Sequence, residues 1–215
     1  MNEQPTLFFI TGPIGVGKST CVASLLKRIS ATGIDFISSD LYYYLYFMNI
    51  NDLEKNNYKK AKALRDYKIN KAITQHKSFI WESVFDDKKI SMIDSFSKQD
   101  YQIFGIFIGT DNLNSLINRV KHRASEDWYN IPEEKIKDRY TMMMGGLKRL
   151  YLISQIFIGV DSNDEGFKLV FFKKYDDMQL VDKNCLWLKQ FLLKNNILYS
   201  TQTNIIENQE EKYHV

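Results

Sequence analysis

The sequence has few of the residues that mark secreted, fibrous or membrane-spanning proteins. Two cysteines, Cys21 and Cys185, are too few for a disulfide framework or a metal-binding cluster. Three prolines and ten glycines leave no Pro/Gly-rich linker, and no apolar run approaches the roughly 18 residues of a membrane span. The stretch MNEQPTLFFI lacks the basic start and the cleavage site of a signal peptide. These absences predict a cytoplasmic protein without a membrane partner.

Neither sign of charge is in large excess. Lysine and arginine number 29 against 26 acidic residues, a net charge of +3, so the composition does not indicate a general nucleic-acid binder. Hydrophobic residues make up 44% of the 215 residues, which suits one α/β domain with a sizeable core. We assign residues 1–199 to that domain and expect the polar tail, 200–215, to be loosely ordered.

Short apolar runs alternate with stretches of helical periodicity. The expected strands are 6–11, 34–38, 79–81, 103–108, 156–160 and 168–172. One helix is expected after the first strand, and further helices are expected at 53–76, 113–120, 132–143 and 184–194. Asp111 is the expected cap of the 113–120 helix, and Pro132 is the expected start of the 132–143 helix. This alternation predicts an α/β fold, a parallel sheet flanked by helices, whose ligands bind at the carboxyl ends of the strands.

The segment FFITGPIGVGKST joins the first expected strand to the first expected helix. It satisfies the phosphate-loop pattern G-x-x-x-x-G-K-[ST] with Gly12, Pro13, Ile14, Gly15, Val16, Gly17, Lys18 and Ser19, followed by Thr20. The glycines let backbone N–H groups curl around phosphate oxygens, and the start of the helix adds its positive dipole. In such loops the lysine reaches the β- and γ-phosphates and the serine hydroxyl ligates Mg²⁺. We therefore predict a binding site for a nucleoside triphosphate and Mg²⁺.

Several classes of phosphate-loop protein need motifs that this sequence lacks. The Asp-x-x-Gly and Asn-Lys-x-Asp motifs of switch GTPases are absent, as is the Leu-Ser-Gly-Gly-Gln signature of transporter ATPases. No strand ends in the pair of acids that motor ATPases usually require. A small phosphotransferase, a kinase, remains.

A kinase needs a carboxylate to accept the proton of the acceptor hydroxyl and cations to neutralise the migrating phosphoryl group. FISSD places Asp40 at the end of the second strand, and FIWESVF places Glu82 at the end of the third. We predict Asp40 as the catalytic base, with Asp40 and Glu82 binding the acceptor. Arg123 and Arg139 bracket a short polar loop in a predicted helical lid at about 119–146, and both are predicted to contact the phosphates.

An aromatic segment, LYYYLYF, follows Asp40 directly. One or two of its rings could contact a nucleobase or a sugar. Such clusters more often pack in a core or against a lid, and we expect packing here.

The order of these motifs resembles that of the zeta-toxin family of P-loop kinases. The glycine loop, SSD, WES and RVKHR…IPEEKIKDRY follow one another as in that family, and GVDSND is similar to its Tyr-Asp-Asn-Ser turn. The resemblance covers roughly residues 5–172. It implies that Lys18 and Ser19 hold ATP and Mg²⁺, that the two acids face the acceptor and that the two arginines close on the phosphates. The resemblance also implies a UDP-N-acetyl amino sugar as the lead acceptor.

Two motifs depart from the family pattern. Its Glu-x-Thr-x-Arg acceptor motif reads Glu82-Ser83-Val84-Phe85-Asp86 here, without the arginine that would bind a diphosphate, and Glu126-Asp127-Trp128-Tyr129 replaces the Gly-Gly-His of the lid. Two alternatives therefore stay open: a kinase of another small hydroxyl-bearing acceptor, such as a nucleotide or a nucleic-acid end, and a catalytically silent nucleotide-binding protein. An antitoxin-like partner is compatible with the resemblance, but no residue indicates one.

Overall fold

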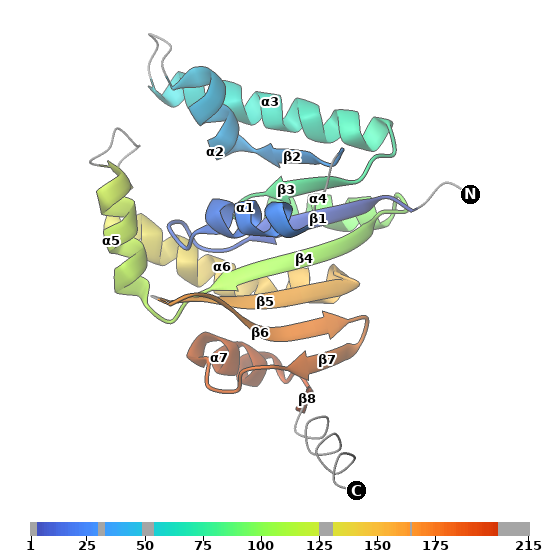
Figure 1. The fold of residues 1–215 in the computed structure, drawn as a ribbon, viewed down its shortest axis with the longest axis vertical. Coiled ribbons are helices and arrows are strands. Elements are labelled where there is room, and N and C mark those ends of the chain that lie inside the picture. Colours follow the sequence, from blue (N-terminus) through green and yellow to red (C-terminus); the bar gives the residue numbers. More distant parts are fainter. Residues whose placement is uncertain (1–3, 30–32, 49–53, 125–130, 164, 202–215) are drawn as a thin grey trace, which may run out of the picture.

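An eight-stranded sheet forms the centre of the molecule, in the order β2-β3-β1-β4-β5-β6-β7-β8 (Figure 1). The structure is a computed structural model that describes residues 4–29, 33–48, 54–124, 131–163 and 165–201. The strands are β1 (Thr6–Thr11), β2 (Asp35–Ser38), β3 (Phe79–Glu82), β4 (Gln102–Gly109), β5 (Ile156–Asn163), β6 (Gly166–Lys174), β7 (Asp177–Leu180) and β8 (Ser200–Thr201).

The sheet combines a parallel part with an antiparallel wing. Strands β2, β3, β1, β4 and β5 pair in parallel, which confirms the predicted α/β architecture. Strands β6 and β7 each turn back on the strand before them and pair antiparallel, because their short connections cannot make the crossover that a parallel pair needs. The expected tail begins with a short strand, β8, paired with β7, and residues 202–215 lie outside the described residues.

Helices cover both faces of the sheet. They are α1 (Lys18–Ile29), α2 (Ser39–Tyr42), the π-helix η1 (Tyr43–Phe47), α3 (Glu54–Thr74), α4 (Asp87–Ser97), α5 (Leu113–Ala124), α6 (Glu133–Ile153) and α7 (Leu186–Asn195). Helix α1 lies on the near face in Figure 1, α4 and α6 lie on the far face, and α3 lies along β2. None of the described helices combines the length and the apolar character needed to cross a bilayer.

The long expected helices are all present, and three further helices, α2, η1 and α4, were not expected. Helix α4 follows the third strand although no helix is predicted there. The Asp86 carboxylate caps it by accepting the N–H of Lys89, and Ile90, Ile93 and Phe96 are buried at helical spacing. These local signals would have been sufficient to predict α4.

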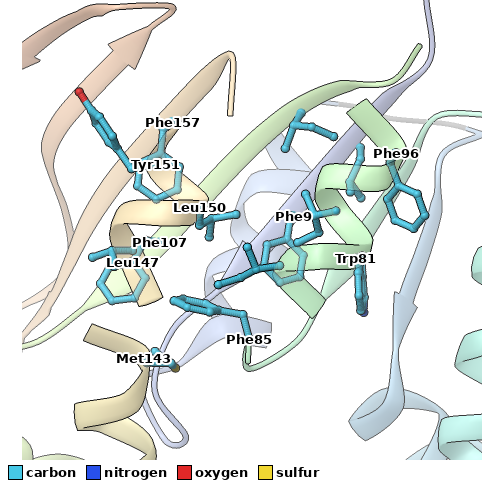
Figure 2. Packing of buried hydrophobic residues seen from close by; sticks show 14 of the residues in the cluster. Phe9, Trp81, Phe85, Phe96, Phe107, Met143, Leu147, Leu150, Tyr151 and Phe157 are labelled. Carbon is cyan, nitrogen blue, oxygen red and sulfur yellow. The ribbon is translucent and has the colours of Figure 1, made fainter. Parts of the chain in front are cut away.

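The sheet separates two large clusters of core residues, and a third, smaller cluster joins α5 and α6. Phe9 and Trp81, with ring centroids 5.0 Å apart, face α4 and α6, where they pack with residues such as Leu147 (Figure 2). Ile10 and Ile80 point to the opposite face and pack in the cluster beneath α1. Successive strand residues alternate between the faces, so a sheet covered on both faces needs the near-continuous apolar runs that the sequence shows.

Asp111 caps a different helix from the one predicted. The Asn112 side chain accepts the N–H of Ser115 at 2.9 Å and caps α5. The Asp111 carboxylate instead accepts the backbone N–H groups of Leu186, at 2.9 Å, and of Trp187, where α7 begins. The prediction for Asp111 is wrong because a carboxylate can reach a helix start that lies 75 residues away along the chain.

The LYYYLYF segment packs only in part. It completes α2 and forms η1. Tyr42 and Tyr43 are buried, as expected, but Tyr44, Leu45 and Tyr46 are 54%, 56% and 58% exposed. The expectation of packing is therefore wrong for these three side chains.

Candidate active site

The glycine loop passes closely over the sheet before α1 begins. A Cβ atom on Gly12 would lie 2.3 Å from the carbonyl oxygen of Ile108 on β4, so only glycine fits there. Gly17 has φ of +94°, a conformation that glycine adopts without strain. Helix α1 starts at Lys18, as expected, so the N–H groups of its first turn face the loop. This geometry suits a phosphate group.

The other residues of the glycine loop can contact a ligand through their backbone, because their side chains point away from the loop or into the core. Val16 is fully buried in the cluster beneath α1, and Ile14 packs beside Ile117. The carbonyl oxygen of Pro13 accepts the N–H of Val16 at 3.3 Å, which closes the turn. Thr20 is exposed on α1.

Lys18 is folded back over the loop and is 8% exposed. Its Nζ donates to the carbonyl oxygens of Gly12, at 3.1 Å, and Pro13, at 3.0 Å. Burial lowers the pKa of Lys18, while the negative charges of Glu82 and Asp40 act to raise it. The loop lysine and both predicted acids therefore lie within electrostatic range of one another.

Glu82 ends β3 and lies against the glycine loop with only 4% exposure. Its Oε2 accepts a hydrogen bond from the Ser19 hydroxyl at 3.2 Å, and the Ser38 hydroxyl is a second partner. Burial raises the pKa of Glu82, and the positive charge of Lys18 opposes this shift. A carboxylate beside the loop serine supplies the oxygen ligands that Mg²⁺ prefers, so Ser19 and Glu82 fit a magnesium site.

Asp40 lies two residues beyond β2, in the first turn of α2. Strands β2 and β3 are neighbours, so Asp40 and Glu82 share one edge of the sheet, as their positions in the sequence predict. The Asp40 carboxylate accepts a hydrogen bond from the Tyr58 hydroxyl of α3 at 2.6 Å. Burial and the charge of Asp40 both raise the pKa of Tyr58, which keeps the phenol a donor. No pattern in the sequence points to Tyr58.

The two predicted arginines flank the site from different helices. Arg123 lies in the last turn of α5 and Arg139 lies on α6, and both side chains are exposed. Burial and the two acids have the largest effects on the pKa of Lys18, and the positive charge of Arg123 lowers it further. Burial and Asp40 raise the pKa of Tyr58, and the positive charges of Arg65 and then Arg139 oppose this shift. Arg123 is thus near the loop lysine and Arg139 near the partner of Asp40. The polar loop between them, 125–130, lies outside the described residues.

The β5–β6 hairpin also reaches the glycine loop. A Cβ atom on Gly17 would lie 3.0 Å from the ring of Phe167, a residue of β6 that is 40% exposed. The guanidinium of Arg119 on α5 donates to the Ser162 hydroxyl of β5 at 3.4 Å. The β5–β6 hairpin therefore lies beside the loop through Phe167, and no pattern in the sequence points to this contact. Residues 159–163 of the GVDSND segment belong to strand β5, and residue 164 lies outside the described residues.

Several solved structures share this architecture, although no protein-family model and no curated protein matches the chain. The AvrRxo1-ORF1:AvrRxo1-ORF2 complex with ATP matches with a TM-score of 0.67 and 13% identity, over 90% of this chain and 63% of that chain. The PezAT chromosomal toxin–antitoxin system of Streptococcus pneumoniae matches with a TM-score of 0.59 and 15% identity, over 80% of this chain and 72% of that chain. The chain therefore shares its fold with these two structures, which is consistent with the resemblance of its motifs to the zeta-toxin-like P-loop kinases.

The shared fold explains why the predicted residues meet. It places the glycine loop after the central strand β1, Glu82 on the adjacent strand β3, and Asp40 beyond β2. The chain spans less than two thirds of the length of the AvrRxo1 structures that it matches. The chemistry proposed for the site therefore rests on the side chains of this chain.

Proposed function

We propose that the protein is an ATP- and Mg²⁺-dependent phosphotransferase that moves the γ-phosphate to a hydroxyl of a small acceptor. The observation that carries this proposal is the convergence of Lys18, Glu82 and Asp40 at one sheet edge, within electrostatic range of one another. A nucleotide-binding protein without activity needs the loop lysine and serine. It does not need a partly exposed carboxylate held by a tyrosine hydroxyl, and this feature favours the kinase.

The loop side of the site binds and activates the nucleotide. Lys18 exchanges the carbonyl oxygens of the loop for the β- and γ-phosphates, and the N–H groups at the start of α1 hold the phosphate oxygens. Ser19 and Glu82 would hold Mg²⁺, which supplies neutralisation of the phosphate charge when bound. Arg123 and Arg139 add positive charge from the two flanking helices as the phosphoryl group moves.

Asp40 acts on the acceptor. The acceptor hydroxyl donates its hydrogen bond to the Asp40 carboxylate, which Tyr58 holds in place. The acceptor oxygen forms a bond to the γ-phosphorus while the bond to the β–γ bridging oxygen breaks and ADP leaves. The proton of the hydroxyl passes to Asp40.

The lead acceptor is a UDP-N-acetyl amino sugar, supported by the resemblance to the zeta toxins. A nucleotide or a nucleic-acid end is the alternative acceptor, favoured by the absence of the arginine from Glu82-Ser83-Val84-Phe85-Asp86. The test is transfer of labelled γ-phosphate from ATP, with Mg²⁺, to UDP-N-acetylglucosamine and to a small-metabolite extract. The labelled product identifies the acceptor.

Asp40→Asn is the decisive control for this assay. The variant keeps the volume of the side chain and the hydrogen bond from Tyr58 but loses the proton acceptor, so transfer should fall about 10²- to 10³-fold while ATP binding persists. Transfer at the wild-type rate would refute the role of Asp40. A wild-type chain that binds ATP and labels nothing would instead favour the silent nucleotide-binding protein.

A further inference from the structure

Three side chains that can bind a metal ion meet where β4 and β5 end and α7 begins. Asp111 lies two residues beyond β4, Asp161 belongs to β5, and Cys185 directly precedes α7. One oxygen of each carboxylate and the sulfur of Cys185 all lie within 4.8 Å of one another. Ligand atoms around a tetrahedral Zn²⁺ lie about 3.5 Å apart, so small side-chain rotations bring these three atoms to coordination distance. The count of cysteines gives no sign of this group, because two of its members are carboxylates.

The thiol of Cys185 is directed at these carboxylates and has no acceptor for its proton. The residue is only 6% exposed, and its S–H donates to none of the residues that the structure describes. Burial raises the pKa of Cys185 to about 12, the N–H of Leu188 opposes the shift, and the negative charges of Asp161 and Asp111 add to it. The sulfur can therefore become a thiolate only beside a cation, and a bound metal ion supplies one.

The two carboxylates are oriented by N–H groups and lack a counter-charge. Asp111 accepts the N–H groups of Leu186 and Trp187, and the indole Nε1 of Trp187 donates to Oδ1 of Asp161 at 3.0 Å. Neither carboxylate forms an ion pair with any residue in the part of the chain that the structure describes. Such hydrogen bonds fix the direction of a metal-binding carboxylate and leave lone pairs free for the ion.

We propose that Asp111, Asp161 and Cys185 bind Zn²⁺, at a site that shares no residue with the proposed Mg²⁺ site at Ser19 and Glu82. Cys185 binds as the thiolate and releases its proton to solvent. Asp111 is exposed and Asp161 is half-buried, so the ion has a path from solvent and a water molecule can fill the fourth position. A thiolate selects Zn²⁺ over Mg²⁺, which prefers oxygen ligands. The bound ion fastens the start of α7 to the ends of β4 and β5.

Co²⁺ in place of Zn²⁺ shows by absorption whether a cysteine binds the ion. The protein is stripped of metal with EDTA and dialysed, and Mg²⁺ is then added in large excess to fill sites made of oxygen ligands alone. A thiolate-to-Co²⁺ charge-transfer band can come only from Cys21 or Cys185, the two cysteines of the chain. We expect the band at one Co²⁺ per chain in the wild type and in Cys21→Ser, its absence in Cys185→Ser, and its loss when Zn²⁺ is added.

Calorimetry with Zn²⁺ measures the contribution of the carboxylates. Asp161→Asn keeps an acceptor for the indole of Trp187 but loses the anionic oxygen, so the Kd should weaken at least about tenfold. Asp177→Asn, at an exposed site where β7 begins, should change the Kd less than twofold. Zn²⁺ at about 100 times its Kd should raise the Tm of the wild type by about 5–10 °C and leave that of Cys185→Ser unchanged.

Two results would overturn the inference: no charge-transfer band in the wild type, or a band of full strength in Cys185→Ser. Circular dichroism checks that each variant is folded. If Cys185→Ser does not fold, an unchanged Zn²⁺ affinity in folded Asp161→Asn overturns the inference equally. None of these measurements reads phosphate transfer, so failure of the zinc site is distinct from failure of the proposed function.

Discussion

The nucleotide side and the acceptor side of the site are built in different ways. The nucleotide side is one continuous segment, residues 12–20, which acts mainly through its backbone and the start of α1. The proposed acceptor side is assembled from side chains of α2 and α3, where the hydroxyl of Tyr58 donates to Asp40, 18 residues away along the chain. The proposed phosphate site is therefore encoded locally, whereas the proposed acceptor site depends on how helices pack.

The largest expected effect tests the nucleotide side. Lys18→Ala removes the ammonium that is proposed to reach the phosphates, so ATP turnover should fall at least about 10³-fold. Labelled-phosphate transfer measures the loss, calorimetry follows ATP binding, and Lys71→Ala on the surface of α3 is the matched control. Turnover within tenfold of the wild type would show that the loop does not bind the reacting phosphates.

The nucleotide side could be predicted from the sequence because its residues are contiguous. The pattern from Gly12 to Ser19 contains both the turn that glycine permits and the helix start that follows it. The shared edge of Asp40 and Glu82 was also predictable, because parallel strands place their carboxyl ends together. Local order and strand pairing together position these groups.

The features of the fold and the site that could not be predicted depend on contacts between segments that are distant along the chain. Tyr58 meets Asp40 only because α3 packs on α2, and Asp111 caps α7 across the molecule. The antiparallel direction of β6 depends on the short β5–β6 connection, because a strand pattern alone does not give direction. Each of these features depends on three-dimensional packing, which single-sequence periodicity does not contain.

Glu82 lies between the two sides, and its removal should have opposite effects on activity and stability. Glu82→Gln loses an oxygen ligand beside Ser19, so Mg²⁺-dependent transfer should fall about 10- to 100-fold. Burial raises the pKa of Glu82 above the ordinary value of 4.5, so the native chain holds this proton more tightly than the unfolded chain. The free energy of unfolding of the wild type therefore falls as the pH rises from about 4.5 through the raised pKa.

The Glu82→Gln chain lacks this titration and should be the more stable protein at neutral pH. Urea unfolding of both chains from pH 4.5 to pH 8 should show a stability difference that grows with pH. Glu134→Gln, at an exposed site on α6, should show no such trend. A variant less stable than the wild type at pH 8 would mean that the buried carboxylate is net stabilising.

A smaller effect is expected on the acceptor side. Tyr58→Phe removes the hydrogen bond that holds Asp40 but keeps the ring beneath Lys62, so kcat should fall about 5- to 10-fold with the KM for ATP unchanged. Tyr67→Phe, at an exposed site of the same helix, is the control. A changed KM for ATP with kcat unaltered would assign Tyr58 to the nucleotide side instead.

The smallest effect on transfer is expected far from both sides, at the start of α7. Asp111→Ala leaves the N–H groups of Leu186 and Trp187 without their carboxylate, which should lower the free energy of unfolding by about 1–2 kcal/mol and Tm by about 3–6 °C. Asp138→Ala, at an exposed site of α6, should leave Tm unchanged.

Transfer per folded Asp111→Ala molecule should stay at the wild-type level, because the cap touches neither the loop nor Asp40. A loss of transfer in fully folded Asp111→Ala protein would show that α7 supports the site, and the division of the molecule into a local nucleotide side and a packed acceptor side would then need a third contributor.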